Sequence, residues 1–170
     1  MQLTGTQFVL REWQDSDVAP LQKHADNVNI SRYLFDRFPH PYTIDDALQF
    51  VSSHKNRYPL TNFVIAIDGI LAGVIEFKPG DDIHRKTAIL GYWLGEEFWG
   101  KDIMTSVIGL ITGYAFENFD IIRIQASVNS NNPASMRVLE KSGFVKEGIL
   151  KNAIIKNSEV LDEHLYALLK

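Results

Sequence analysis

The residues best placed to do chemistry lie between Trp99 and Ser106, where an apolar strand turns into a long helix. The first amides of a helix have no partner inside the helix, and the helix dipole is positive at that end. Gly100 allows the chain to turn tightly between the two elements. The stretch 88–116 therefore predicts a binding site for an anionic ligand, in particular a phosphorylated one.

A second polar loop, Asn129–Asn132, precedes another predicted helix. Asn132 suits the N-cap position, and Pro133 suits the first helical position because proline has no backbone N–H to satisfy there. The chain thus has two places where a polar loop leads into the start of a helix.

Other kinds of catalytic site have little support in the sequence. The five histidines, at positions 24, 40, 54, 84 and 164, lack the spacing of metal ligands, so we predict no metal site. The absence of cysteine excludes disulfides, thiolate nucleophiles and cysteine-based zinc sites. Neither a Gly-x-Ser-x-Gly nucleophile turn nor a Walker loop is present.

Composition indicates an ordinary globular protein, with 45% hydrophobic and 22% charged residues and a net charge of −4. With no basic run, we expect no nucleic-acid partner. No apolar run approaches the ~18 residues that span a bilayer, so we expect no membrane association. The N-terminal residues MQLTGTQFVLREW do not resemble a signal peptide, and we expect a cytoplasmic protein. We predict that residues 1–170 form a single domain.

Periodicity and turn signals predict the elements that position these loops. Thr43 is a predicted N-cap with Asp46 as its capping-box partner, and Asp68-Gly69 is a two-residue hairpin turn. Gly143 is expected to end a helix. The predicted elements are a strand at 7–12, a helix that begins at 15–17, a helix or a short turn of helix at 28–35, a helix from 43 to about 56, strands at 62–67, 71–78 and 86–94, a helix at 102–117, a strand at 121–128, a helix at 134–141, and two final strands at 144–150 and 160–168 that form a hairpin around 156–158.

Consecutive hairpin strands followed by a strand–helix–strand crossover predict a mixed sheet with helices on its faces. The crossover from Leu90 to Val128 is expected to be right-handed, and its two strands parallel. The strand that ends at Leu94 is almost continuously apolar, which indicates a central position. Ligands bind beyond the carboxyl ends of such strands, so we expect Gly95–Lys101 and Asn129–Asn132 to face one crevice.

Three stretches make the chain similar to the GNAT superfamily of acetyl-CoA-dependent N-acetyltransferases: LREWQDSDVAPL, GYWLGEEFWGKD and NSNNPASMRVLEKSGFVKEGIL. Within that superfamily the chain resembles the branch of ribosomal-protein N-terminal acetyltransferases and related polyamine and amino-acid acetyltransferases. The resemblance covers nearly the whole chain, and the third stretch is its most specific part. It implies the GNAT acyl-CoA N-acyltransferase fold, an α/β fold with a central mixed sheet flanked by helices.

The resemblance implies acetyl-CoA as the acetyl donor, with its pyrophosphate held by main-chain amides of the turn after the fourth strand. A main-chain amide between Trp93 and Gly95 is expected to hold the acetyl oxygen. Asn132 matches the asparagine that contacts the pantetheine arm, a role that is compatible with an N-cap. The residues expected at the cofactor are Trp93, Leu94, Trp99, Gly100, Lys101, Asp102, Ile103, Met104, Thr105 and Asn132.

Two residues depart from the family's phosphate-turn pattern, which is Gln or Arg, two residues, Gly, one residue, and Gly or Ala. Asp102 stands at the first small position and Met104 at the second, while Trp99 at the start is usual for this branch. A carboxylate at position 102 adds like charge beside a dianionic ligand. An acid at that place is also favourable to an unliganded helix N-terminus.

Ser135 matches the serine proposed, in this branch, to protonate the departing coenzyme A thiolate. Its other interpretation is a first-turn serine that caps its own helix. Many other members use a tyrosine four residues before Gly-Phe, where this chain has Leu139. Because the strand 87–94 contains no acid, the general base stays open among four residues: Glu76, Glu96, Glu97 and His84.

We expect an N-acetyltransferase that transfers an acetyl group directly from acetyl-CoA to a primary amine in a ternary complex. The acceptor could be a protein N-terminus, a polyamine, an amino acid or an aminoglycoside-like compound. Its site is expected among the first two helices, the loop 35–42 and the last hairpin. The alternative is a non-catalytic ligand-binding or interaction module on the same fold, which Asp102 and Met104 favour. Apolar residues at a sheet edge leave a homodimer open.

Overall fold

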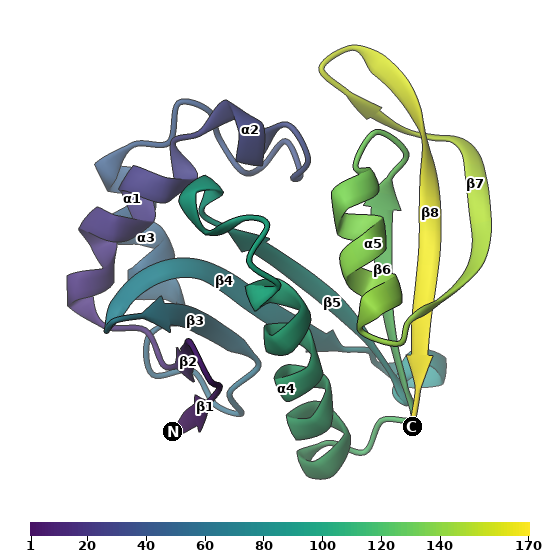
Figure 1. Cartoon of the computed structure of the whole chain (residues 1–170), viewed down its shortest axis with the longest axis horizontal. Helices are drawn as coiled ribbons and strands as arrows, with labels where there is room; N and C mark the ends of the chain where they lie inside the picture. The colour runs from purple at the N-terminus through teal and green to yellow at the C-terminus, as the bar shows by residue number, and fades with distance from the viewer. The chain divides into compact units, whose positions relative to one another are not determined.

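A computed structural model describes residues 1–170. The strands are ordered β1-β2-β3-β4-β5-β6-β8-β7 in one mixed sheet (Figure 1). The longest helix that connects them, α4, has 16 residues, and no helix is both long and apolar enough to cross a membrane. The elements are β1 (Gln2–Thr4), β2 (Val9–Arg11), α1 (Val18–Ala25), α2 (Val28–Ser31), α3 (Ile44–His54), β3 (Asn62–Ile67), β4 (Ile70–Pro79), β5 (Thr87–Leu94), α4 (Ile103–Asn118), β6 (Arg123–Asn129), α5 (Pro133–Lys141), β7 (Val145–Lys156) and β8 (Glu159–Leu169), with short 3₁₀ turns η1 (Asp15–Asp17), η2 (Asp82–His84) and η3 (Glu96–Phe98).

The chain forms two compact units, and each is described by itself. The first unit comprises residues 1–76 and 92–103, and the second comprises residues 77–91 and 104–170. The boundaries fall inside β4, β5 and α4, so each of these elements contributes residues to both units.

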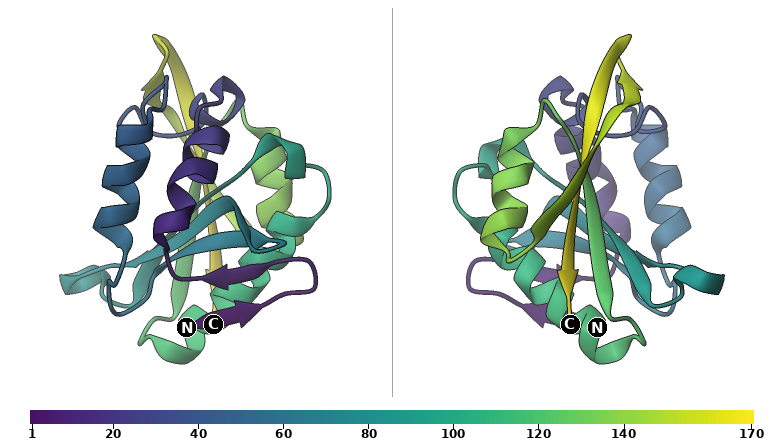
Figure 2. Two further views of the ribbon diagram at one scale, coloured as in Figure 1. Left: turned by 90° about the vertical axis from the view of Figure 1, so that its left-hand side faces the viewer. Right: turned by 90° about the vertical axis from the view of Figure 1, so that its right-hand side faces the viewer.

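In the first unit, strands β1 to β4 are joined in antiparallel order, and α1 and α3 lie side by side (Figure 2). The helices bury their apolar faces on the sheet, because alternate strand residues point to that side. The buried cluster between them comprises Trp13, Leu21, Ala25, Tyr42, Ala47, Val51, Val64, Ala66, Leu71 and Val74.

A buried ion pair fixes the start of α1 in the first unit. The Arg11 guanidinium donates to both oxygens of Asp17, at 2.8 and 2.6 Å, and Asp17 also accepts from the backbone N–H of Gln14. Two parallel bonds between a guanidinium and a carboxylate give a defined geometry. The strand β2 is thereby tied to the helix that follows it.

In the second unit, β6 pairs in parallel with β5 and antiparallel with β8, and β8 pairs with the edge strand β7. The strands β7 and β8 form a long, strongly twisted hairpin (Figure 2). The helix α5 is held by the buried Tyr166, whose hydroxyl donates to Glu140 at 3.0 Å. Burial, followed by this hydrogen bond, raises the pKa of Tyr166 to about 12, so its phenol stays neutral at physiological pH.

Most of the predicted elements are confirmed, including the parallel pairing of the crossover strands and the strand Asn62–Ile67. Of the two alternatives predicted for 28–35, the short turn of helix is confirmed, since α2 ends at Ser31 and turns follow it. The strand predicted at 71–78 extends one residue further at each end, because β4 runs from Ile70 to Pro79. The sequence did not predict β1, and it ended the first strand of the last hairpin too early, since β7 continues to Lys156; the turn predicted around 156–158 is confirmed.

Candidate functional site

In the turn that follows β5, two side chains donate hydrogen bonds to main-chain carbonyl oxygens earlier in the chain. The Trp99 indole N–H donates to the carbonyl oxygen of Leu94 at 2.7 Å, and the Lys101 ammonium donates to the carbonyl oxygen of Glu97 at 2.9 Å. Between them lies η3. These contacts fix the predicted phosphate turn within the first unit.

Two residues of this turn have left-handed backbone angles, with φ of 73° at Gly100 and 53° at Asp102. Glycine adopts this region without strain, and aspartate is among the few other residues that enter it. Position 102 is where the family pattern has a glycine. The backbone there therefore keeps the conformation that favours glycine, although the side chain is an exposed carboxylate.

Gly95 is packed so tightly that no side chain would fit. Its N–H donates to the carbonyl oxygen of Ala72 at 2.8 Å, and a Cβ atom at this position would lie 2.8 Å from Nδ1 of His24. Burial lowers the pKa of His24, which therefore packs against the turn as a neutral ring. Because the Gly95 amide is bonded to β4, it is not available to hold an acetyl oxygen.

At the start of α4, the side chains of Ile103 and Met104 are buried, so only their main-chain atoms could face a ligand. Thr105 follows them, and its hydroxyl oxygen is buried without a hydrogen-bond partner. Buried polar atoms are nearly always paired, so an orphaned hydroxyl fits a place where a ligand supplies the missing bond.

In the second unit, Asn132 caps α5 as predicted: its Oδ1 accepts the backbone N–H of Ser135 at 3.2 Å, and Pro133 begins the helix. The amide NH₂ of Asn132 points the other way and is a donor. The neighbouring Asn131, which the sequence reasoning did not select, has a buried Oδ1 without a partner. The position where other members have tyrosine holds Leu139, which is fully buried and has no hydroxyl group.

The predicted cofactor residues are thus divided between the units. Trp93 to Ile103 belong to the first, and Met104, Thr105, Asn132 and Ser135 belong to the second. Within each unit the donor set fits coenzyme A. The first has a turn of left-handed residues with a lysine; the second has the unpaired Thr105 hydroxyl, which can donate, and the unpaired Asn131 Oδ1, which can only accept. The carboxylate of Asp102 is the group that does not match.

The four candidate bases lie in different surroundings. Glu76 is exposed and accepts a hydrogen bond from Asn62 at 2.8 Å, and His84 lies in η2, before the first residue of β5. Glu96 and Glu97 follow directly after β5. No acid projects from β5 itself.

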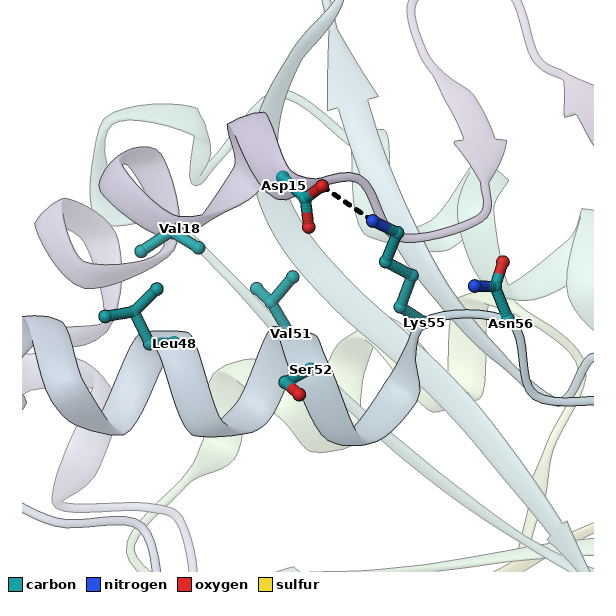
Figure 3. Close-up of a pocket in the computed structure, with 7 residues that line it drawn as sticks. All are labelled: Asp15, Val18, Leu48, Val51, Ser52, Lys55 and Asn56. Atoms are coloured by element: carbon teal, nitrogen blue, oxygen red, sulfur yellow. Dashed lines mark hydrogen bonds and ion pairs between the residues drawn. The ribbon is translucent and has the colours of Figure 1, made fainter.

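A pocket of about 390 Å³ lies elsewhere in the first unit, between α1 and α3 (Figure 3). An ion pair of 2.6 Å between Lys55 and Asp15 crosses its rim, and Val18, Leu48 and Val51 form its apolar wall. None of the predicted catalytic or cofactor residues lines it, so it is separate from the candidate site.

Residues 7–145 match the family model described as an acetyltransferase (GNAT) domain. The chain belongs to the GNAT acetyltransferase family. Over 99% of its length it is 35% identical to the uncharacterized N-acetyltransferase YoaA of Bacillus subtilis, with 96% of that protein covered. It is 43% identical to the probable N-acetyltransferase YjcK of the same organism over 62% of this chain, and spans 61% of the length of YjcK.

The fold of this GNAT chain is confirmed by solved structures. A ribosomal L7/L12 alpha-N-protein acetyltransferase, solved in complex with coenzyme A, is similar with a TM-score of 0.83 and 27% identity over 99% of this chain and 98% of that one. The predicted family and fold class are therefore correct. In this family the acetyl donor is acetyl-CoA. This agrees with the polar groups described above in each unit.

Proposed function

We propose that the protein is an N-acetyltransferase that transfers the acetyl group of acetyl-CoA to a primary amine by direct attack. The observation that carries the proposal is the turn from Trp99 to Asp102, which follows β5 and keeps the left-handed backbone of a phosphate-binding turn at positions 100 and 102. The L7/L12 acetyltransferase supports a protein N-terminus as one acceptor class. The predicted cytoplasmic location and the homodimer stay predictions.

The residues proposed to hold acetyl-CoA are those predicted from the resemblance. Amides between Gly100 and Thr105 would face the pyrophosphate, the Lys101 ammonium would offset part of its charge, and the amide NH₂ of Asn132 would donate to the pantetheine arm. When bound, acetyl-CoA supplies a thioester carbonyl for the amine to attack. A main-chain N–H of Trp93 or Leu94 would bind the oxygen of that carbonyl.

Ser135 is proposed as the proton donor for the leaving sulfur, through its Oγ–H. The half-buried side chain lies in the first turn of α5, and the Ser135 backbone N–H is bonded to Oδ1 of Asn132.

Titration of acetyl-CoA by calorimetry and thermal shift tests the proposal. Ligand at a hundred times its dissociation constant stabilises a protein by about 2.7 kcal/mol, which raises the melting temperature by several degrees. Transfer is then followed with a panel of amines, and Ser135→Ala should slow it while leaving acetyl-CoA affinity nearly unchanged. No binding at millimolar acetyl-CoA would contradict the enzyme and favour the non-catalytic module. Equal activity in Ser135→Ala would remove Ser135 as the acid.

A further inference from the structure

Glu96, two residues beyond β5, has its carboxylate held by two side-chain amides. Asn27 donates to Oε2 at 2.6 Å, and Asn29 donates to Oε1 and Oε2 at 3.1 and 3.2 Å. The orientation of the Asn27 amide is fixed, because its Oδ1 accepts the backbone N–H of Asn29 at 2.8 Å as the N-cap of α2. Its NH₂ group must therefore point towards Glu96.

The donors that hold Glu96 are uncharged, and this distinguishes it from its neighbour. Glu97 lies 3.3 Å from the ammonium of Lys23 and 3.6 Å from the ring of His24. Hydrogen bonds from Asn27 and then Asn29 lower the pKa of Glu96. The carboxylate of Glu96 is thus ionised and held in one orientation, but no positive charge balances it. A carboxylate in this state is ready to bind a cation.

Two aromatic rings lie in the same unit as this carboxylate, and one of them belongs to Trp93 near the end of β5. Trp93 packs on the buried cluster of the first unit that includes Ala25 of α1, and its ring meets that of Phe38 edge to face at 6.1 Å. Asn27 follows Ala25 by two residues, and Figure 1 shows the turn after β5 beside the α1–α2 connection. Both rings are half-buried, so part of their surface stays accessible, and ring faces attract cations.

The amine that attacks a thioester must be neutral, which limits what Glu96 can do. A carboxylate that binds the attacking group as an ammonium would raise the pKa of that amine and slow the reaction. A carboxylate with a lowered pKa is also a poor proton acceptor. Both arguments favour a cationic group that does not react.

We propose that Glu96 binds a positively charged group of the acceptor other than the amine that is acetylated, so that the preferred acceptor carries at least two cationic groups. The inference rests on the proposed acetyltransferase function and names the substrate class of that site. It covers diamines and longer polyamines, and peptides with a basic side chain near the N-terminus.

Matched pairs of amines test this proposal in the purified protein. Putrescine is compared with n-butylamine, and cadaverine with n-pentylamine, as acceptors at saturating acetyl-CoA. The diamine should have the higher kcat/KM, beyond the statistical advantage of its two equivalent amino groups. Glu96→Gln should reduce that preference by about five-fold, mainly through KM, as expected for a solvent-accessible ion pair. Glu97→Gln removes the same charge one residue away and should keep the preference.

Controls separate this inference from the proposed function. Acetyl-CoA affinity should be the same in wild type and Glu96→Gln, and circular dichroism should show that both are folded at the assay temperature. In wild type alone, the diamine preference should fall as sodium chloride rises, because salt screens an exposed charge pair. The inference is overturned if diamine and monoamine are used equally, or if the preference survives Glu96→Gln. It is also overturned if the protein binds acetyl-CoA but acetylates neither amine. Absence of acetyl-CoA binding overturns the proposed function itself.

Discussion

At the scale of single residues, the charge of Asp102 has opposite effects on the free protein and on the protein with a bound pyrophosphate. Its φ of 53° lies in the region where glycine is unstrained, and L-residues there lose about 1–2 kcal/mol. Its carboxylate is exposed and lies one residue before α4, at the end of a helix that attracts anions. Without a ligand the charge is favourable, whereas beside a pyrophosphate it is repulsive. The residue therefore favours the free protein over the bound one.

We predict that Asp102→Gly and Asp102→Asn both tighten acetyl-CoA binding, by about five- to ten-fold at low salt, because each removes the like charge. Asparagine also tolerates the left-handed backbone, so it separates the effect of charge from that of backbone freedom. Dissociation constants from calorimetry at low and high salt check this. The gain should shrink at high salt, and an unchanged or weaker affinity in both variants would refute the electrostatic argument.

Residue roles that depend on neighbours in sequence could be predicted, and those that depend on distant ones could not. The Asn132 cap is an example of the first kind, because its partner Ser135 is three positions away. The bonds from Asn27 and Asn29 to Glu96 are of the second kind, because they join positions 69 and 67 residues apart. From sequence alone Glu96 was one of four candidate bases, and nothing distinguished it from the other three. Only the fold shows that it is held by uncharged amides.

At the scale of elements, the accurate predictions rest on strong local chemistry. Asp68 and Gly69 have φ of 50° and 81°, as a two-residue hairpin turn requires, so the β3–β4 hairpin was predictable. The strand β1 has only three residues and is defined by its pairing with β2, a contact that no short pattern encodes. The length of β7 has the same origin, since its pairing with β8 resumes after an irregularity between Leu150 and Ile154.

At this scale we predict how the loss of the capping box at the start of α3 affects stability. Thr43 accepts the backbone N–H of Asp46 at 3.2 Å, and the Asp46 carboxylate accepts the backbone N–H of Thr43 at 2.8 Å. Thr43→Ala should lower the melting temperature by about 2–4 °C at neutral pH, because an N-cap is lost. Ser52→Ala, which removes an exposed hydroxyl from the same helix, should have little effect.

The cost of Thr43→Ala should depend on pH with a definite sign. Hydrogen bonds from Thr43 lower the pKa of Asp46 below its unfolded value. A carboxyl group whose folded pKa is depressed stabilises the protein above its unfolded pKa, and that stability is lost as pH falls through the folded pKa. The difference in melting temperature between wild type and variant should therefore narrow in acid. A difference that widens on acidification would contradict the assigned role of Asp46.

At the scale of the whole molecule, the two compact units are not two consecutive pieces of chain. The chain passes from one unit to the other at positions 76–77, 91–92 and 103–104, each time within an element. Domain boundaries usually fall in exposed linkers, where few contacts cross. Here each boundary falls inside a strand or a helix. The residues on its two sides therefore belong to one continuous element, which we expect to form and to melt as one piece.

We therefore predict that residues 1–170 unfold in a single cooperative transition, as one domain does. Calorimetric and van't Hoff enthalpies of unfolding should agree, and fluorescence and circular dichroism should report one midpoint. All three tryptophans lie in the first unit, at positions 13, 93 and 99, so fluorescence follows that unit while far-ultraviolet dichroism follows the whole chain. A fluorescence midpoint that departs from the dichroism midpoint would show that the first unit melts separately.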